Sequence, residues 1–159
     1  MYNPEIMKQC FKIALFTSTH NIGGPFGAAV VKDGQIVESG SNSVIQSKDP
    51  TCHAEMNVIR QACIRLGTYD LSDCELYATG YPCPMCLGAI MWANIKKVYV
   101  SGTLEDAEKV GFKDKFIYET IDKLKNMCYN NNELVMEFHN NELAKDLYKT
   151  YALNNGIIY

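Results

Sequence analysis

The stretch ELYATGYPCPMCLGAIMWANIKKVYV, residues 75–100, carries the strongest signal for the fold. Glu75–Thr79 and Val98–Val100 have the composition of short strands, and the apolar segment Pro84–Ala93 between them has the length of a helix. A strand, a helix and a second strand within about thirty residues are typical of a right-handed parallel βαβ unit. We therefore expect an α/β protein with at least one pair of parallel strands.

The residues before this unit predict two helices and a hairpin. Asn3 followed by Pro4 is typical of a helix start, and Asp33-Gly34 is a two-residue turn signal between strand-like segments. In chain order, we expect a helix from Pro4 with Ile6, Cys10, Ile13 and Phe16 at helical spacing, a hairpin of Gly27–Val31 and Gln35–Glu38, an extended piece with Val44 and Ile45, and a helix from Asp49-Pro50 to Gly67.

The residues after the unit continue the alternation of helices and strands. We expect a helix over Ile117–Asn126, a strand over Leu134–Phe138 and a last helix over Glu142–Leu153. No internal repeat, low-complexity run or linker interrupts the chain. Residues 1–159 are therefore predicted to form a single domain.

Length, composition and cysteine count indicate an ordinary globular domain with reduced thiols. The 159 residues are 47% hydrophobic and 21% charged, which supports a core and excludes a long disordered chain. The seven cysteines are an odd number, and the first residues lack the basic region and apolar run of a secretion signal. We therefore expect a cytoplasmic protein rather than a secreted disulfide framework.

The charge balance narrows the class of partner. Fifteen basic and eighteen acidic residues give a net charge of −3, whereas proteins that grip nucleic acid through phosphates usually have a basic surplus. No apolar run approaches the ~20 residues that span a bilayer. The sequence favours a small neutral or polar substrate over a nucleic acid or a membrane.

Two short segments, CHAE at 52–55 and PCPMC at 82–86, carry the chemistry. Histidine and cysteine are preferred zinc ligands, and a set of three protein ligands leaves one coordination position open for water. Cys83 and Cys86 lie three residues apart at a predicted helix start, so both sulfurs face one side near the positive end of the helix dipole. His53 lies in the first turn of the preceding predicted helix. Two helix N-termini are thus expected to converge on one Zn²⁺ ion.

Glu55 is suited to move protons beside such a metal. Near a helix N-terminus it can face the open coordination position without being a ligand. Zinc lowers the pKa of bound water to near 7, and an adjacent carboxylate can take that proton and pass it to a leaving amine. The combination H-x-E followed by P-C-x-x-C is the signature of zinc-dependent nucleobase deaminases.

Other uses of the same cysteines stay open at this point. Cys83 and Cys86 are also compatible with half of a four-ligand structural zinc site, completed by Cys52 or Cys74, or with a thioredoxin-like pair. A non-catalytic, zinc-stabilised binding module is a further alternative. The acidic residue of the CHAE segment argues against all of these, because none of them uses an unligated acid. The cysteines expected to be small core residues are Cys10, Cys63 and Cys128.

At these residues the chain resembles the cytidine and deoxycytidylate deaminase superfamily, and within it the bacterial-type guanine deaminases. The similar stretches are GGPFGA at 23–28, DPTCHAE at 49–55, PCPMCLGAI at 82–90 and GFKDKFIY at 111–118. The resemblance implies a three-layer α/β/α sandwich around a mixed five-stranded sheet, one zinc per subunit and a homodimer. It also implies a purine-salvage reaction in which water attacks C2 of guanine and releases ammonia and xanthine.

The resemblance also assigns roles to three residues that would contact the base. Phe26 would stack on the purine, and Asn42 would hydrogen-bond the base edge. Asp114 would accept hydrogen bonds from N1–H and the N2 amine, an adjacent pair of donors that guanine has and that adenine and cytosine lack. The same carboxylate would relay a second proton.

Three further residues complete the implied site. Two other residues beside it depart from the family pattern. The backbone N–H groups of Ala54 and Cys83 would stabilise the reacting oxygen. Tyr159, in the C-terminal segment 140–159, would close the site of its own subunit or of a partner. Glutamate commonly precedes the PCPMC motif in these deaminases, but Tyr81 stands there in this chain. Gly80 likewise replaces a larger residue. Both departures lie at the mouth of the expected pocket.

Two neighbouring substrate classes remain as alternatives, namely the adenosine of a tRNA and a cytosine-type base. A tRNA deaminase would be expected to have a basic groove and a basic C-terminal helix. This chain has a pI of about 5.6 and ends in Ile-Ile-Tyr. A free purine base, with guanine first, is therefore the predicted substrate.

Overall fold

A computed structural model of the chain describes residues 1–125, 142–154 and 157. Contacts divide the chain into two units, Met1–Tyr118 and Glu119–Tyr159. None of the helices in these described ranges combines the length and the apolar character needed to cross a bilayer. The predicted metal ligands all belong to the first unit.

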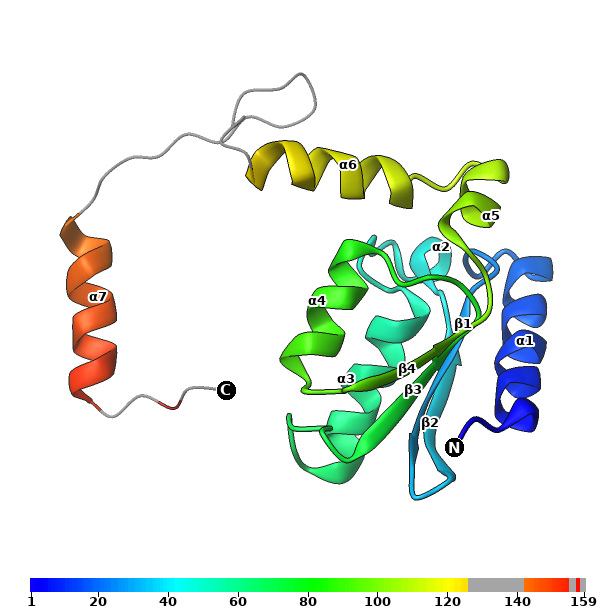
Figure 1. Cartoon of the computed structure of the whole chain (residues 1–159), viewed down its shortest axis with the longest axis horizontal. Helices are drawn as coiled ribbons and strands as arrows, with labels where there is room; N and C mark the ends of the chain where they lie inside the picture. Colours follow the sequence, from blue (N-terminus) through cyan, green and yellow to red (C-terminus); the bar gives the residue numbers. More distant parts are fainter. Residues whose placement is uncertain (126–141, 155–156, 158–159) are drawn as a thin grey trace. The chain divides into compact units, whose positions relative to one another are not determined.

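A mixed sheet with the strand order β2-β1-β3-β4 forms the centre of the first unit (Figure 1). β1 (Gly27–Lys32) runs antiparallel to β2 (Gln35–Ser41) and to β3 (Cys74–Ala78), whereas β3 and β4 (Lys97–Val100) are parallel. Helix α4 (Pro84–Trp92) connects the two parallel strands, which confirms the predicted βαβ unit.

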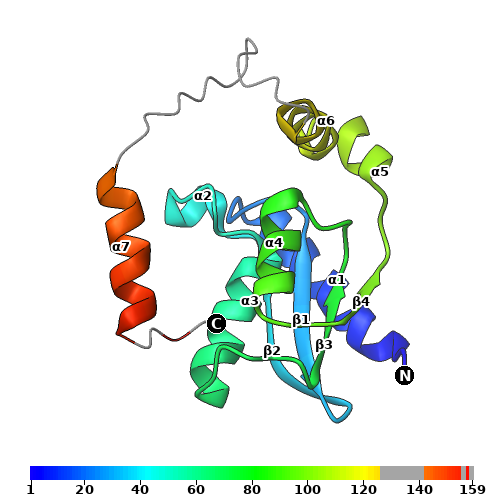
Figure 2. The same cartoon turned by 60° about the vertical axis from the view of Figure 1, so that its left-hand side comes forward.

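Helices cover both faces of this sheet and produce the predicted three layers. Figures 1 and 2 both show α1 (Pro4–Thr19) on one face and α3 (Ala54–Leu66) with α4 on the other. The residues of β1 alternate between these two sides. Ala28 and Val30 belong to the core under α3 and α4, and Ala29 and Val31 belong to the core under α1.

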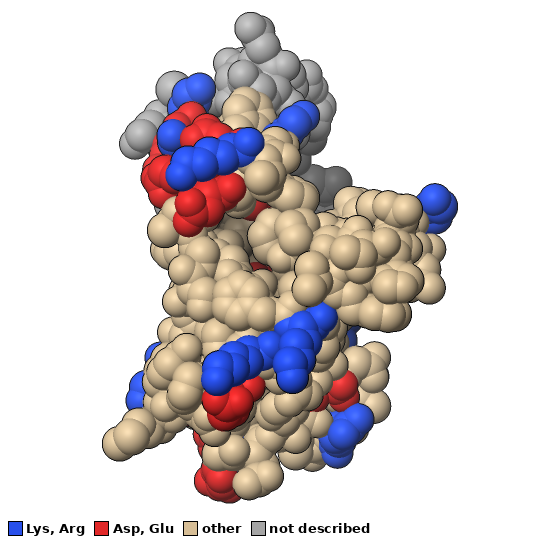
Figure 3. All heavy atoms as spheres, turned by 90° about the vertical axis from the view of Figure 1, so that its right-hand side faces the viewer, with Lys and Arg blue, Asp and Glu red and all other residues tan. Residues whose placement is uncertain are grey.

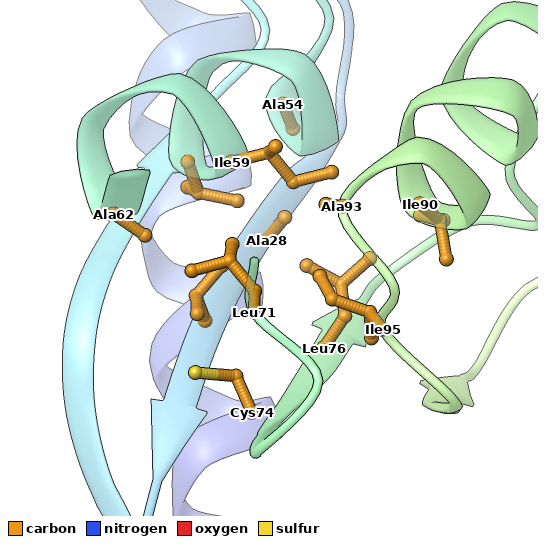
Figure 4. Close-up of a cluster of buried hydrophobic side chains, with 12 residues drawn as sticks. Ala28, Ala54, Ile59, Ala62, Leu71, Cys74, Leu76, Ile90, Ala93 and Ile95 are labelled. Carbon is orange, nitrogen blue, oxygen red and sulfur yellow. The ribbon is translucent and has the colours of Figure 1, made fainter. Parts of the chain in front are cut away.

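The larger core fixes the positions of α3 and α4 relative to the sheet (Figure 4). Ala62, Leu71 and Leu76 in this cluster are fully buried. Burial of apolar surface contributes roughly 25 cal/mol per Å² to folding, and close packing leaves the helices little freedom to shift. The N-terminal ends of α3 and α4 are therefore held as rigid parts of one layer.

Several local predictions are confirmed by the structure. The side chain of Asn3 caps α1 by accepting a hydrogen bond from the backbone N–H of Glu5. Asp33 and Gly34 in the hairpin turn have φ angles of 51° and 75°, as a tight hairpin turn with two positive φ values requires. Helices α6 (Asp114–Lys125) and α7 (Glu142–Leu153) occupy the regions predicted to be helical.

The expected extended piece at Val44 and Ile45 is wrong, because these residues begin the short helix α2 (Val44–Ser47). The Asn42 Oδ1 atom accepts a hydrogen bond from the Val44 N–H at 3.1 Å, and the Ser47 N–H donates to the Ser43 carbonyl. These contacts override the strand preference of two β-branched residues.

The expected helix start at Asp49 is also wrong, because α3 begins at Ala54 with His53 as its N-cap. The Asp49 carboxylate instead accepts hydrogen bonds from the N–H and the hydroxyl of Thr51, both at 2.7 Å. Aspartate stabilises such local turns as readily as helix caps. His53 consequently lies directly before the first turn of α3, as its N-cap, rather than within that turn.

Two further differences concern α1 and the edge of the sheet. Phe16 is 57% exposed, because Ala14 and Thr17 occupy the inner face of α1. The sheet has four strands among the described residues rather than five. The predicted strand Leu134–Phe138 lies outside those residues. Helix α5 (Leu104–Lys109) was not predicted.

Candidate active site

The three predicted metal ligands come together where the N-terminal ends of α3 and α4 meet. His53 is the N-cap of α3, Cys83 is the N-cap of α4, and Cys86 lies one turn into α4. The Nδ1 atom of His53 is 3.6 Å from Cys83 Sγ and 3.7 Å from Cys86 Sγ. One ligand atom from each residue lies within 4.8 Å of the other two.

These separations fit a tetrahedral zinc site. Zn–S bonds of about 2.3 Å and Zn–N bonds of about 2.0 Å at tetrahedral angles place neighbouring ligand atoms roughly 3.6 Å apart. The observed distances from the imidazole to the two sulfurs therefore suit one small ion. The group contains three side chains among the described residues, which leaves a fourth position open, as catalytic rather than structural zinc requires.

The protein favours a thiolate in this group. A hydrogen bond from Cys86 lowers the pKa of Cys83 to about 4, and the same contact raises the pKa of Cys86. The hydrogen bond with Cys83 is also the main reason that the pKa of His53 is raised. The pair thus favours a thiolate at Cys83, and a divalent cation would displace the remaining thiol proton on binding.

Glu55 lies beside the ligands without joining them. It is the second residue of α3 and is 6% exposed. The Cys86 thiol donates to its Oε2 atom over 3.6 Å. Burial is the main cause of the raised pKa of Glu55. A carboxyl group with a raised pKa is suited to take up and release protons near neutral pH.

A cavity of about 580 Å³ opens beside His53. Asn42 also lines it and is 4% exposed. Asn42 Oδ1 accepts hydrogen bonds from the N–H groups of Gly24 and Val44, each at 3.1 Å. The remaining lining residues are Ser18, Asn21, Gly23, Gly24, Pro25, Val44, Ile45, Pro50 and Phe112.

Gly23 is required for the close approach of two chain segments at this cavity. A Cβ atom at this position would lie 2.2 Å from the Asn42 carbonyl oxygen and 2.3 Å from Oδ1. Any other residue would push the Asn42 segment away, because the contact is with backbone as well as side chain. The first glycine of the GGPFGA stretch is thus required by the packing of these two segments.

Asp114 and Tyr118 bring the start of α6 to the same region. Burial raises the pKa of Asp114, and the negative charge of Cys83 raises it further, so the carboxyl group lies within electrostatic range of the metal ligands. The Tyr118 hydroxyl donates to the Pro82 carbonyl oxygen at 2.7 Å. This bond ties α6 to the loop that leads into Cys83.

Phe112 lines the cavity, although the sequence pointed to Phe26. The two rings meet edge to face with centroids 4.8 Å apart, but Phe26 is not among the described residues that line the His53 cavity. Its ring lies over Gly80, where a Cβ atom would be 2.9 Å from Cδ1 of Phe26. Phe112 follows the glycine of the GFKDKFIY stretch, so that motif contained the signal for it.

The remaining predicted site residues are placed as follows. Ala54 is fully buried at the first position of α3, where backbone N–H groups have no partner within the helix. The side chain of Tyr81 is 47% exposed, and its ring centroid is 6.3 Å from that of Tyr118. Tyr159 lies outside the described residues.

The chain belongs to the family of the cytidine and deoxycytidylate deaminase zinc-binding region, whose sequence profile matches residues 2–102. It is therefore a zinc-binding hydrolytic deaminase. The three side chains that fit the ion are His53, Cys83 and Cys86.

Among individual relatives, the chain is 50% identical over 123 residues to the guanine deaminase of Bacillus subtilis, across 77% of this chain and 79% of that one. The crystal structure of the B. subtilis guanine deaminase superposes with a TM-score of 0.82 and 42% identity, covering 100% of this chain and 98% of that chain. A tRNA-specific adenosine deaminase of Aquifex aeolicus is 51% identical over 77 residues, 48% of this chain and 51% of that one.

Proposed function

We propose that this protein is a guanine deaminase that converts guanine and water to xanthine and ammonia. The observation that carries the proposal is the three-ligand zinc site with the buried, unligated Glu55 beside it. Similarity to B. subtilis guanine deaminase over 77% of the chain supports guanine as the base.

Glu55 moves the protons of this reaction. In such a site zinc supplies a nucleophile at neutral pH by lowering the pKa of water. The Glu55 carboxylate accepts the proton that water loses as its oxygen attacks C2, and it delivers that proton to N2. The C2–N2 bond then breaks and ammonia leaves. The remaining hydroxyl proton moves to N3 as the water oxygen becomes O2 of xanthine.

Asn42 and Asp114 orient the base in this proposal. Asn42 Oδ1 is occupied by two backbone N–H groups, so its Nδ2 donates to an acceptor on the base. The Asp114 carboxylate accepts from the adjacent N1–H and N2–H donors of guanine. Phe112 provides aromatic surface for the purine, with Phe26 packed against its ring, and the N–H groups of Ala54 and Cys83 stabilise the reacting oxygen.

A tRNA adenosine substrate is the second candidate, because a tRNA-specific adenosine deaminase matches 48% of the chain. The surface charge favours a free base instead. Basic side chains pair with acidic ones, as in Lys32–Asp73 and Lys115–Glu108. On the face in Figure 3, blue and red atoms are likewise interspersed within a large uncharged area. A tRNA would need a basic groove for its phosphates.

We also propose that the enzyme works as a cytoplasmic homodimer. The six cysteines among the described residues are all free, which fits a reducing compartment. The outer side of α4 exposes Leu87, Met91 and Trp92 to solvent. A helix that is apolar on all sides is normally covered, and a second copy of this chain is the partner we propose.

Residues 140–159, including α7 and Tyr159, are the segment that we propose to close over an active site, either in the same subunit or in the partner subunit. The resemblance to the family, in which a terminal tyrosine has this role, is the basis for this assignment.

A substrate screen tests the proposed function. The zinc-loaded protein is incubated with guanine, adenine, cytosine, their nucleosides and a tRNA, and ammonia release is measured for each. We expect turnover of guanine well above that of the other substrates. Turnover of the tRNA alone, weakened by added salt, would support the second candidate, and turnover of none would contradict both.

A further inference from the structure

One side chain of α3 joins the two chain segments that carry the base-binding and metal-binding residues. The Nδ2 atom of Asn57 donates to the Ser41 carbonyl at 2.9 Å, the Ser43 hydroxyl at 3.1 Å and the Cys52 carbonyl at 3.4 Å. Two of these neighbours are carbonyl oxygens, which only accept, so the Asn57 atom facing them must be the amide nitrogen. Its two hydrogens are shared among three acceptors.

These partners lie directly next to site residues. Ser41 and Ser43 flank Asn42 in the chain, and Cys52 precedes His53. The Ser43 N–H donates to the Cys52 carbonyl at 2.9 Å, and the Asn57 N–H donates to the His53 carbonyl at 3.0 Å. Asn57 therefore connects the Asn42 segment and the His53 segment through its hydrogen bonds to both.

The orientation of the Asn42 amide depends on this arrangement. Its Oδ1 atom is held by the Gly24 and Val44 N–H groups, and the structure shows no hydrogen bond from its Nδ2 to another described residue. A shift of the backbone at 41–43 would break the two contacts at Oδ1 and leave the amide free to turn. Nδ2 would then no longer keep one orientation at the cavity that Asn42 lines.

We propose that Asn57 is a positioning residue, which acts through Asn42 to fix a hydrogen-bond donor for the base. This inference rests on the proposed function and assigns the base an acceptor opposite Asn42 Nδ2. Asn57 touches neither the base nor the metal. Its loss should therefore weaken binding of the base while leaving the zinc site loaded.

A double-mutant cycle tests this role. Guanine turnover is measured for the wild type, Asn57→Leu, Asn42→Ala and the double variant, with zinc content measured in parallel. Loss of a hydrogen bond of ordinary strength predicts a KM increase of about 2- to 10-fold for Asn57→Leu, with kcat within about twofold and one zinc per chain. In the Asn42→Ala background, Asn57→Leu should change KM by less than about twofold, because coupled residues are not additive.

Val58→Ala is the matched control. Val58 is the next residue of α3, is 1% exposed in the core and packs beside Gly40. This variant loses stability but keeps the three hydrogen bonds of the Asn57 side chain. Its KM should stay at the wild-type value. An Asn57→Leu effect that persists fully in the Asn42→Ala background, or that Val58→Ala reproduces, would overturn the proposal. Asn57→Asp, which keeps the shape but cannot donate when ionised, replaces Asn57→Leu if that variant does not fold.

A measurement without turnover separates this proposal from the proposed function. The side-chain amide signals of Asn42, assigned by their absence in Asn42→Ala, are recorded by NMR for the wild type and Asn57→Leu. We expect the signals to move or broaden in Asn57→Leu and to stay unchanged in Val58→Ala. Unchanged signals in Asn57→Leu would overturn the positioning role whatever base the enzyme uses. Absence of guanine turnover by the wild type would contradict only the proposed function.

Discussion

Burial of the Glu55 side chain determines how readily its carboxyl group binds and releases a proton. Its side chain is 6% exposed and touches a cysteine sulfur, and burial raises its pKa. Desolvation disfavours the charged form, so the group holds a proton more readily than an exposed glutamate. A group that gains and loses a proton in each cycle needs such a pKa.

Glu55→Gln should remove catalysis and preserve the metal site. Glutamine has nearly the same shape but cannot carry a proton between water and the leaving amine. We expect a loss in kcat of about 10²- to 10⁴-fold, measured by ammonia release, with zinc content unchanged. Glu75→Gln is the control, because Glu75 lies in β3 next to Cys74, at the strand end away from Cys83. Near-normal kcat in Glu55→Gln would contradict the role of Glu55.

The contribution of the Cys10 thiol to the free energy of unfolding should be lost at alkaline pH. It is fully buried, and burial raises its pKa from 9.0 to about 11. The folded state therefore keeps this proton to higher pH than the unfolded chain. Its contribution to stability is complete below pH 9 and is lost as the pH rises toward 11.

The test compares urea unfolding of the wild type and Cys10→Ala between pH 8 and 11. The difference between their free energies of unfolding should shrink with rising pH, by at most about 3 kcal/mol, since one pKa unit corresponds to about 1.4 kcal/mol. Other titrating groups cancel in this difference. A difference that stays constant to pH 11 would show that Cys10 ionises equally in both states.

At the scale of elements, the site depends on where two helices begin. Both N-caps, His53 and Cys83, supply a ligand side chain rather than a capping hydrogen bond. The positive ends of the two helix dipoles stabilise thiolates at this point. The core between the sheet and the two helices holds both ends in register.

The C-terminal end of α3 offers a test of helix termination. Gly67 has a φ of 67° and ends α3 with its N–H bonded to Cys63 and Ile64 carbonyls. A Cβ atom there would meet no other atom within 4 Å, so conformation alone sets the cost of a substitution. Gly67→Ala should lower the free energy of unfolding by about 1 to 2 kcal/mol, measured by urea unfolding, with kcat unchanged.

Gly67→Asn is the matched control for this prediction, because asparagine tolerates the left-handed conformation better than alanine. It should cost less than Gly67→Ala. Equal costs for the two variants would mean that lost contacts, rather than backbone strain, explain the effect.

Elements with strong local signals could be predicted from the sequence. The βαβ unit, the Asp33-Gly34 hairpin and the metal ligands all follow from spacing over a few residues. Helix α5 also had a local signal, because Thr103 and Asp106 form a reciprocal capping box. That signal was present in the sequence and was missed.

The features that could not be predicted depend on contacts between distant segments. Val44 begins a helix because its N–H donates to Asn42 Oδ1 and because the Gln46 N–H donates to the Ile22 carbonyl. Phe112 lines the cavity because the chain after β4 comes back to Phe26, where the two rings pack edge to face. The same principle applies to Asn57, whose partners lie 5 to 16 residues away. Neither periodicity nor composition reports such contacts.

For the molecule as a whole, the exposed apolar side of α4 is the surface through which we propose that two subunits pair. Leu87, Met91 and Trp92 are 36%, 69% and 66% exposed, and two copies of this surface can meet across a twofold axis. Leu87→Glu with Met91→Glu should convert the dimer to a monomer in sedimentation velocity, because it places like charges across an apolar contact. Ile64→Glu, at a 73% exposed position of α3, is the control. A wild type that sediments as a monomer would contradict the dimer.

The central claim is that water replaces the amino group at C2 of guanine in this site, and an isotope experiment tests it most directly. The zinc-loaded enzyme is given guanine in ¹⁸O-labelled water, and the purine product and ammonia are quantified by mass spectrometry and an ammonia assay. We predict xanthine with one ¹⁸O atom, at C2, and one ammonia per xanthine. No xanthine, or xanthine without the label, would contradict the account.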